Sequence, residues 1–178
     1  MRIVAGSLRG RRFEAPEGKS TRPTTDKVRE AVFNALWSMD VLDEARVTDM
    51  FAGSGALGFE ALSRGASHCT FVESDRRAVA VIKSNIEHLG LESRSTVLHG
   101  DAMSRRDVLA ASDIVLADPP YEFTDWQKLL MQVAEARQDL ATTVVVESDK
   151  PLAIIEGWDA IRSKRYGGTW VTFLQRLP

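Results

Sequence analysis

The 178-residue chain is poor in cysteine and has no long hydrophobic run. Its single cysteine, Cys69, cannot form an internal disulfide, which excludes a disulfide scaffold and a zinc site built from several thiolates. The longest apolar runs are about six residues, too short to span a bilayer, and the N-terminus lacks the apolar core of a signal peptide. We therefore expect a cytoplasmic protein with no membrane partner.

Two further scarcities narrow the class of protein. The 12 glycines and 6 prolines are too few for a fibrous or low-complexity chain. The histidines His68, His88 and His99 show no spacing typical of metal ligands, so no metal is expected. What is present, 44% apolar and 27% charged residues, is ordinary for a globular protein, and the length is that of one domain.

The net charge of −2 is distributed unevenly along the chain. Residues 1–22 carry six basic and two acidic side chains, a local balance of +4, so residues 23–178 carry −6. Within the basic segment, residues 2–5 and 11–14 are β-like and predict a small hairpin. A basic arm on an acidic body suggests an extension that binds an anionic partner; a merely solvated basic tail is the alternative.

Hydrophobic periodicity predicts an α/β fold. Val28, Ala31, Val32, Ala35 and Leu36 follow helical spacing, which predicts a helix over about 26–39. Short β-rich runs then alternate with helical stretches, a pattern typical of a parallel sheet covered on both faces. The β-rich runs lie at 47–51, 69–73, 96–98, 114–117 and 142–146, and the helical stretches near 56–64, 75–89, 104–111 and 125–138.

The last part of the chain has a different pattern. Residues 160–166 and 169–175 are both β-like and meet at Gly167-Gly168. This predicts a terminal hairpin whose last strand runs antiparallel to its neighbours. The expected architecture is a doubly wound, mostly parallel seven-stranded sheet over residues 23–178, with the basic hairpin arm of residues 1–22 attached to it.

A glycine-rich turn follows the first predicted strand. Gly53-Ser-Gly55-Ala-Leu-Gly58 matches the G-x-G-x-x-G fingerprint in its required context of strand, turn and helix. Such glycines allow a tight turn and a close approach of the backbone to a ligand. Glu73 ends the next strand, 20 residues after Gly53, where a carboxylate can bind the two ribose hydroxyls. The pattern favours a nucleotide-like cofactor over a turn that merely requires glycine.

Carboxylates at successive strand ends indicate which cofactor binds. Asp49 lies just before the glycine turn, where it would repel a pyrophosphate but suit the ammonium and sulfonium groups of S-adenosylmethionine. Asp101 follows the third β-rich run, at a height where it could accept a hydrogen bond from an adenine amino group. Together with Glu73, these residues line the crevice where open α/β sheets bind ligands. They favour an adenosyl ligand with positive charge over a dinucleotide.

The fourth β-rich run ends in Asp118-Pro119-Pro120-Tyr121. Two consecutive prolines fix φ and stiffen the chain where strands of this fold deliver ligand contacts. Asp118 and the Pro119 carbonyl offer two acceptors, and Tyr121 offers an aromatic face. These groups suit a planar ring with an exocyclic amine. Hydrogen bonds from the amine to the two acceptors would localise the nitrogen lone pair, and the Asp118 carboxylate would offset the positive charge that develops on the nitrogen. A proline turn with a surface tyrosine is the alternative.

These motifs resemble a known family. Asp49-Met-Phe51-Ala-Gly53-Ser-Gly55 together with Asp118-Pro-Pro-Tyr121 is similar to class I methyltransferases that act on amino nitrogens. The segments Arg2-Ile-Val-Ala-Gly-Ser, Arg9-Gly-Arg-Arg and Arg22-Pro-Thr-Thr-Asp-Lys narrow the resemblance to the bacterial RsmD family. It implies methyl transfer from S-adenosylmethionine to the exocyclic N2 amine of a guanine in 16S rRNA. The substrate would be the small ribosomal subunit or its assembly intermediate, with no obligate protein subunit.

The resemblance also implies roles for individual residues, taken together with the motifs above. The glycine turn would hold the methionine part of the cofactor, and residues 118–121 would form the target-base site. The expected cofactor-binding residues are Thr24, Asp49, Phe51, Gly53, Gly55, Glu73, Ser74, Asp101 and Ala102; the catalytic residues are Asp118, Pro119, Pro120 and Tyr121; the RNA-binding residues are Arg9, Arg11, Arg12 and Arg22.

Several alternatives stay open at the level of sequence. A methyltransferase for DNA adenine N6 or protein glutamine N5 would share the same pocket chemistry, and a non-catalytic nucleotide-binding module would need no amine site. Phe123 either forms a wall of the base pocket or packs under the loop. We expect Glu60, on the helix after the glycine turn, to be a solvated or capping residue, and Cys69 to be a buried small apolar residue.

Overall fold

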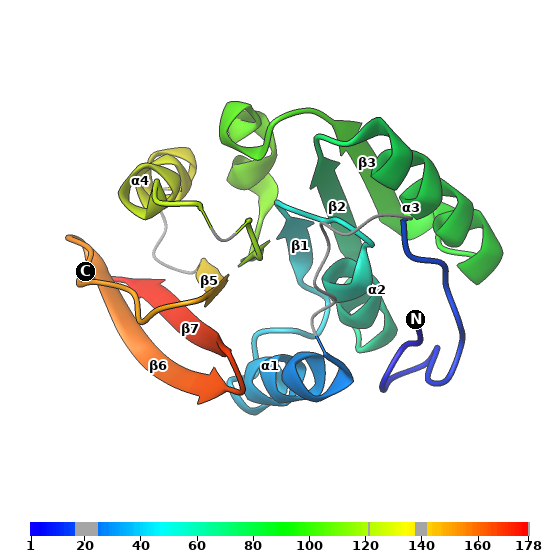
Figure 1. Cartoon of the computed structure of the whole chain (residues 1–178), viewed down its shortest axis with the longest axis horizontal. Helices are drawn as coiled ribbons and strands as arrows, with labels where there is room; N and C mark the ends of the chain where they lie inside the picture. The colour runs from blue at the N-terminus through cyan, green and yellow to red at the C-terminus, as the bar shows by residue number, and fades with distance from the viewer. Residues whose placement is uncertain (17–24, 121, 138–141, 178) are drawn as a thin grey trace.

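The structure is a computed structural model that describes residues 1–16, 25–120, 122–137 and 142–177. It contains one seven-stranded sheet with helices beside it (Figure 1). The strands are β1 (Arg46–Asp49), β2 (His68–Glu73), β3 (Ser95–His99), β4 (Ile114–Ala117), β5 (Thr143–Ser148), β6 (Trp158–Tyr166) and β7 (Thr169–Arg176). The α-helices are α1 (Asp26–Ser38), α2 (Ala56–Ser63), α3 (Arg76–Leu89) and α4 (Trp126–Ala136), and the 3-10 helices are η1 (Glu92–Arg94), η2 (Ala102–Ser104) and η3 (Arg106–Ala111).

The strand order across the sheet is β3-β2-β1-β4-β5-β7-β6. β1 to β5 pair in parallel, whereas β7 pairs antiparallel with both β5 and β6. The predicted mostly parallel sheet with an antiparallel last strand is therefore confirmed. The chain order reverses between β1 and β4, which creates the kind of switch point where open α/β sheets bind ligands.

From residue 26 onward, element boundaries follow the predicted ones to within two residues, except over 104–111. The predicted N-terminal hairpin of residues 2–5 and 11–14 is reduced to a single bridge between Arg2 and Arg12. A helical stretch was expected over 104–111, and the structure has the 3-10 helices η2 and η3 instead. Short 3-10 turns are common as connectors between longer elements. None of the helices in the described ranges has the length and apolarity needed to cross a membrane.

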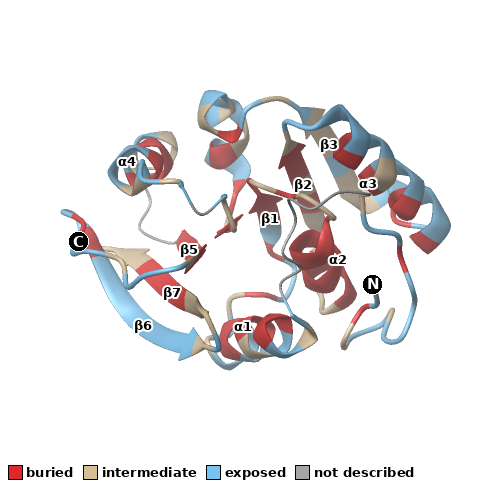
Figure 2. Cartoon of the chain, viewed as in Figure 1, coloured by how far each residue is buried: buried red, intermediate tan, exposed pale blue. Residues whose placement is uncertain are grey.

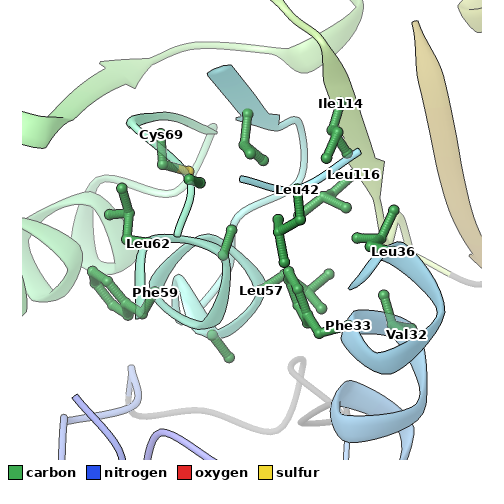
Figure 3. Close-up of a cluster of buried hydrophobic side chains, with 14 of the residues drawn as sticks. Val32, Phe33, Leu36, Leu42, Leu57, Phe59, Leu62, Cys69, Ile114 and Leu116 are labelled. Carbon is green, nitrogen blue, oxygen red and sulfur yellow. The ribbon is translucent and has the colours of Figure 1, made fainter. Parts of the chain in front are cut away.

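Side chains on the two faces of the sheet form two separate core clusters. Figure 2 shows that the buried residues gather in the sheet and on the helix sides that face it. Along β4, Ile114 and Leu116 belong to the cluster beneath α1, α2 and α3, and Val115 and Ala117 to the cluster beneath α4 and η3. This alternation follows from the two-residue period of a strand, and burial on both faces explains the continuous apolar sequence. Figure 3 shows the first cluster around Phe59 and Cys69; Cys69 is buried, as predicted.

The N-terminal residues pack onto this frame through their own apolar side chains. Ile3 is 1% exposed and Phe13 is 4% exposed, and both belong to the first core cluster. The pairing between the two β-like pieces is limited to one bridge, between Arg2 and Arg12. Gly6 has φ +85°, and a Cβ on it would lie 1.9 Å from the Ser63 carbonyl oxygen. Only glycine therefore allows the segment to approach α2 this closely.

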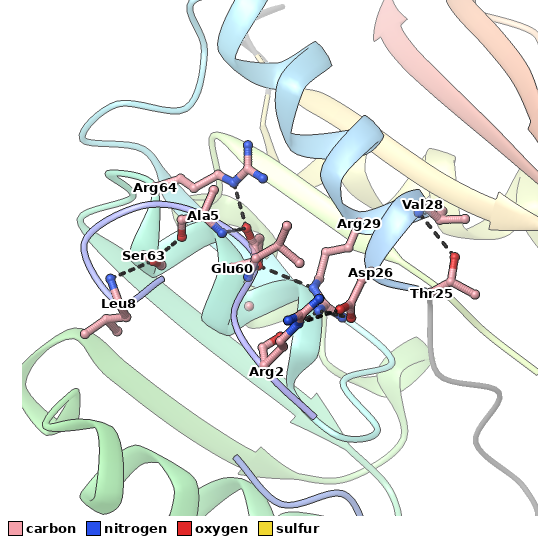
Figure 4. Close-up of polar contacts among 12 residues, drawn as sticks. Arg2, Ala5, Leu8, Thr25, Asp26, Val28, Arg29, Glu60, Ser63 and Arg64 are labelled. Atoms are coloured by element: carbon pink, nitrogen blue, oxygen red, sulfur yellow. Dashed lines mark hydrogen bonds and ion pairs between the residues drawn. The ribbon is translucent and has the colours of Figure 1, made fainter. Parts of the chain in front are cut away.

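Glu60 is the centre of a buried ion network that joins the N-terminal segment to α1 and α2 (Figure 4). Its side chain is fully buried, so the expectation of a solvated or capping residue was wrong. Its carboxylate accepts hydrogen bonds from the backbone N–H groups of Val4 and Ala5, at 2.8 and 3.0 Å. It also pairs with Arg29 and Arg64. The sequence position on a helix could not reveal this role, because the partners lie up to 56 residues away.

We expect Glu60→Ala to lower the free energy of unfolding by about 3–5 kcal/mol, because it leaves a buried guanidinium and two backbone N–H groups without their acceptor. Urea denaturation measures this directly. Glu30→Ala, which removes an exposed carboxylate from α1, is the control and should change stability by no more than about 0.5 kcal/mol. Equal stabilities for the two variants would contradict the network's structural role.

Candidate active site

A cavity of about 750 Å³ lies at the carboxyl ends of the parallel strands. The strand order places β1 beside β4 at the switch point, and residues that follow both strands line this cavity. Eight of the residues predicted to form the site are among the lining residues: Asp49, Phe51, Gly53, Glu73, Ser74, Asp118, Pro119 and Pro120. The tertiary structure thus brings the expected cofactor residues and the expected amine-binding residues to one space.

Three other residues predicted to bind the cofactor lie outside the lining of this cavity, as do the predicted RNA-binding residues Arg9, Arg11 and Arg12. Gly55 is the N-cap of α2, and its left-handed backbone conformation turns the chain into the helix. Asp101 is exposed and caps η2, where its carboxylate accepts from the Met103 N–H and the Ser104 hydroxyl. Ala102 is buried in the second core cluster. Thr24, Tyr121 and Arg22, also predicted site residues, lie outside the residues that the structure describes.

The three glycines of the turn are required for two different physical reasons. Gly53 and Gly55 have φ values of +53° and +78°, a region that residues with a Cβ rarely adopt. Gly58 is different, because a Cβ there would lie 2.2 Å from a ring carbon of Phe71 on β2. The third glycine of the fingerprint therefore lets α2 pack closely on the sheet.

Glu73 is held in place at the end of β2 by backbone donors. Its Oε2 accepts from the Gly53 N–H at 2.7 Å, and its Oε1 accepts from the Asp75 N–H at 2.8 Å. Oε1 also accepts from the Ser74 hydroxyl at 3.3 Å. Because each carboxylate oxygen has about two acceptor positions, Oε2 keeps capacity for a ligand hydroxyl. The arrangement fixes the carboxylate on the cavity wall and ties it to the glycine turn.

Asp49 is a buried carboxyl group at the end of β1. Its Oδ2 accepts from the Gly58 N–H at 3.1 Å, whereas its Oδ1 has no hydrogen-bond partner among the described atoms. The pKa of Asp49 is raised from 3.8 to about 7, mainly by burial and also by the negative charges of Asp118 and Glu73, while the Gly58 hydrogen bond opposes the shift. A buried, incompletely satisfied carboxyl on a cavity wall suits a cationic ligand group.

Asp118 follows β4 directly and begins a stiff corner. The Phe123 N–H donates to the Pro120 carbonyl at 2.9 Å, which closes the turn after the two prolines. The Phe123 ring packs edge-on against Phe51, with centroids 5.4 Å apart, and against Trp126, at 4.7 Å. Phe123 also lines the cavity, so it both packs against neighbouring rings and forms part of the cavity wall. Contact of this wall with a target base stays a prediction.

Comparison with known proteins identifies the family. A family model described as conserved hypothetical protein 95 matches residues 1–175. Ribosomal RNA small subunit methyltransferase D of Haemophilus influenzae is 33% identical over 94% of this chain and 89% of that protein. The chain belongs to the RsmD family.

Two further proteins agree with this membership. The YlbH protein of Bacillus subtilis is 36% identical over 99% of both chains. The solved structure of the yhhF protein from Escherichia coli has a TM-score of 0.83 and 33% identity, and covers 99% of this chain and 97% of that chain. The expected fold class and the expected family are thus both confirmed, and the similarity extends over the whole length.

In this RsmD-family chain, sequence reasoning missed part of the cavity wall. Lys27 at the start of α1 lines the cavity, and so do residues 164–169 at the turn between β6 and β7. Glu147 on β5 lines it as well and is buried. Lys27 ends the family segment that begins at Arg22, and Gly167-Gly168 marks the predicted hairpin turn, but neither pattern indicates that these residues face the cavity.

Proposed function

We propose that this chain is an S-adenosylmethionine-dependent methyltransferase that modifies the exocyclic N2 amine of a guanine in 16S rRNA. One observation carries the proposal: Asp49 and Glu73 share a single cavity with Asp118 and the double proline. A cofactor site and an amine site that open into the same space are what direct methyl transfer between two bound molecules requires. The similarity to ribosomal RNA small subunit methyltransferase D supports the choice of rRNA as substrate.

The residues present fit the cofactor. The unpartnered, buried oxygen of Asp49 suits a cationic group such as the cofactor's ammonium, which would stabilise the ionised carboxyl. Glu73 would accept hydrogen bonds from the ribose hydroxyls, next to the turn at Gly53. Phe51 and Ser74 also line the cavity and complete the proposed contacts there. When bound, S-adenosylmethionine supplies an activated methyl group.

The chain's own contribution to the chemistry is to hold the amine. The Asp118 carboxylate and the Pro119 carbonyl would accept hydrogen bonds from the two N–H groups of the exocyclic amine. This arrangement would turn the nitrogen lone pair out of conjugation with the ring. As positive charge develops on the nitrogen, the nearby carboxylate stabilises it. The aromatic wall of Phe51 and Phe123 would contact the apolar surface of the base. Tyr121 keeps its proposed stacking role.

The proposed substrate is rRNA within the small ribosomal subunit or its assembly intermediate, in the cytoplasm, without an obligate protein subunit. Residues 1–22 would serve as the RNA-contacting arm of the 23–178 methyltransferase domain. Arg9 and Arg12 are exposed and suit this role. Arg11 also has an internal role, since its guanidinium donates to the carbonyls of Leu89 and His88 at the end of α3.

A side-by-side methylation assay tests the function. The purified protein and radiolabelled S-adenosylmethionine are incubated with small subunits from a strain lacking this activity, with naked 16S rRNA, with duplex DNA and with a glutamine-containing protein. We expect label in the small-subunit RNA, recovered after nuclease digestion as N2-methylguanosine by mass spectrometry. Label in adenine of the DNA or in the protein would support the corresponding alternative methyltransferase, and cofactor binding without any transfer would support a non-catalytic module.

A further inference from the structure

The hairpin of β6 and β7 presents an exposed strand beside the cavity. β6 is the edge strand of the sheet, and every residue from Asp159 to Arg165 is exposed (Figure 2). Its partner β7 is buried over Val171–Leu174 and pairs with β5 in the middle of the sheet. The hairpin is therefore anchored firmly on one side and open to a partner on the other.

The exposed strand is basic where it approaches the cavity. Residues 161–169 contain Arg162, Lys164 and Arg165 and no acidic residue. Lys164 and Arg165 line the same cavity as Asp118, and so does the exposed Lys27 of α1. The carboxylates lie at the strand ends, whereas these cations lie on the hairpin and on α1. The cavity mouth thus has a basic rim on the side of the amine site, although Asp149 lies near it at the end of β5.

Ring contacts limit the freedom of two of these side chains, Lys164 and Arg162. The Lys164 Nζ lies 5.4 Å from the centroid of the Tyr166 ring, and the Arg162 guanidinium lies over Phe173 at 6.0 Å. Such contacts leave the charges exposed but already restrict the side chains, so less side-chain conformational entropy is lost when a ligand binds. Tyr166 itself packs against the first core cluster, which holds the turn close to α1.

The position of the hairpin matters because a guanine in structured RNA must leave its stack to reach a buried site. The phosphates on either side of that nucleotide then lie at the mouth of the pocket. A mouth with several carboxylates inside would repel them unless cations stand at the rim. Figure 1 shows residues 1–16 and the β6–β7 hairpin on opposite sides of α1. Met1, Ala15 and Pro16 of the N-terminal segment also line the cavity, but none of them has a basic side chain, so the cationic side chains of the described lining come from the hairpin and α1.

We propose that Lys164 and Arg165 contact the RNA phosphates next to the target guanine, so that the β6–β7 hairpin is a second RNA-binding surface. This inference rests on the proposed function. The hairpin holds the RNA strand that carries the guanine, and the N-terminal arm binds the RNA from the other side of α1. Neither residue touches the reacting atoms, so their loss should affect capture of the RNA and leave the cofactor site intact.

The test is the double variant Lys164→Gln/Arg165→Gln, assayed on undermethylated small subunits over a range of salt concentrations. Loss of two phosphate contacts should make the slope of log affinity against log salt shallower by about 1.4–1.8. We expect KM for the subunit to rise roughly tenfold or more near 0.1 M salt. The rate at saturating subunit and the affinity for S-adenosylhomocysteine should both stay within about twofold of the wild type.

Two matched variants separate this role from others. Lys83→Gln/Lys128→Gln removes two exposed positive charges from α3 and α4, away from the cavity, and should retain the wild-type KM and salt slope. Lys164→Arg/Arg165→Lys exchanges the side chains but keeps both charges, and should retain most of the affinity. If the hairpin variant behaves like the control, the inference is wrong although the function stands. If the wild type methylates no small-subunit RNA, the proposed function fails first, and the inference fails with it.

A loss of folding cannot imitate the expected result. Affinity for S-adenosylhomocysteine, measured by calorimetry on each variant, reports an intact cofactor site independently of RNA. A variant with unchanged cofactor affinity and a raised KM supports the inference. A variant whose KM rises equally at low and high salt contradicts it, because a phosphate contact must weaken with salt.

Discussion

Replacing Asp118 by alanine is expected to reduce the rate of methyl transfer at saturating substrates by about 10³-fold, while the cofactor still binds. The carboxylate is the one charged group of the Asp118-Pro-Pro corner, and it acts on charge that develops only as the amine reacts. Removing such a group typically costs two to four powers of ten in rate. Single-turnover methylation of small subunits measures the step directly, and calorimetry with S-adenosylhomocysteine should give a dissociation constant within about twofold of the wild type.

Two related variants make the result specific. Asp118→Asn keeps one oxygen acceptor but loses the charge, so we expect a rate between those of the wild type and the alanine variant. Glu122→Ala removes an exposed carboxylate only four residues away that does not line the cavity, and should leave the rate unchanged. Normal turnover by Asp118→Ala would refute the proposed amine site, whatever the identity of the RNA.

The second large effect is on stability and concerns Asp49. The pKa of this carboxyl is raised from 3.8 to about 7 by burial, so the folded protein holds a proton that the unfolded chain releases. Between these two pH values the folded state binds more protons, and its stability falls as pH rises. From pH 5 to pH 8 the wild type should lose about 2–3 kcal/mol of unfolding free energy relative to Asp49→Asn, which has no proton to release.

Denaturant unfolding of both proteins at pH 5 and pH 8, without cofactor, measures this difference. The asparagine variant can still accept from the Gly58 N–H through its side-chain oxygen, so the comparison isolates the buried charge. A constant difference in stability across this range would show that Asp49 has an ordinary pKa.

The same group should couple cofactor binding to pH. Because a cationic ligand favours the ionised carboxyl, the affinity of the wild type for S-adenosylmethionine should weaken as pH falls below about 7, and binding there should release a proton. Calorimetry in buffers of different ionisation enthalpy counts that proton. Asp49→Asn should bind more weakly and lose the pH dependence. Asp49 thus lowers the stability of the ligand-free protein at neutral pH but provides the negative charge that binds a cationic ligand, a compromise common in binding sites.

Much of the fold was accessible from sequence because the relevant signals are local. The helix over α1, the alternating strand and helix runs and the final antiparallel hairpin all follow from hydrophobic period and glycine positions. The family model that matches residues 1–175 confirms the family inferred from the motifs. The segment at 104–111 was less predictable, since short 3-10 turns have no period of their own.

The positions of some site residues could likewise be predicted from the sequence, and those of others could not. Asp49, Glu73 and Asp118 each end or follow a strand, and in a parallel sheet the carboxyl ends lie at one edge, so their meeting in one cavity could be expected from order along the chain. Asp101 also follows a strand, yet it caps η2 outside the described cavity lining. The difference arises from the direction of a side chain in a short connector, which strand order does not determine.

The sequence by itself determined the parallel sheet, the glycine turn and the stiff proline corner, since each depends on backbone preferences of a few adjacent residues. Only the tertiary structure decided that Glu60 is buried beneath the N-terminal segment and that the exposed residues Lys164 and Arg165 line the cavity. Both depend on contacts between residues far apart in the chain. Which charge is buried and which is exposed is set by the surfaces that packing brings together, and no local pattern encodes that choice.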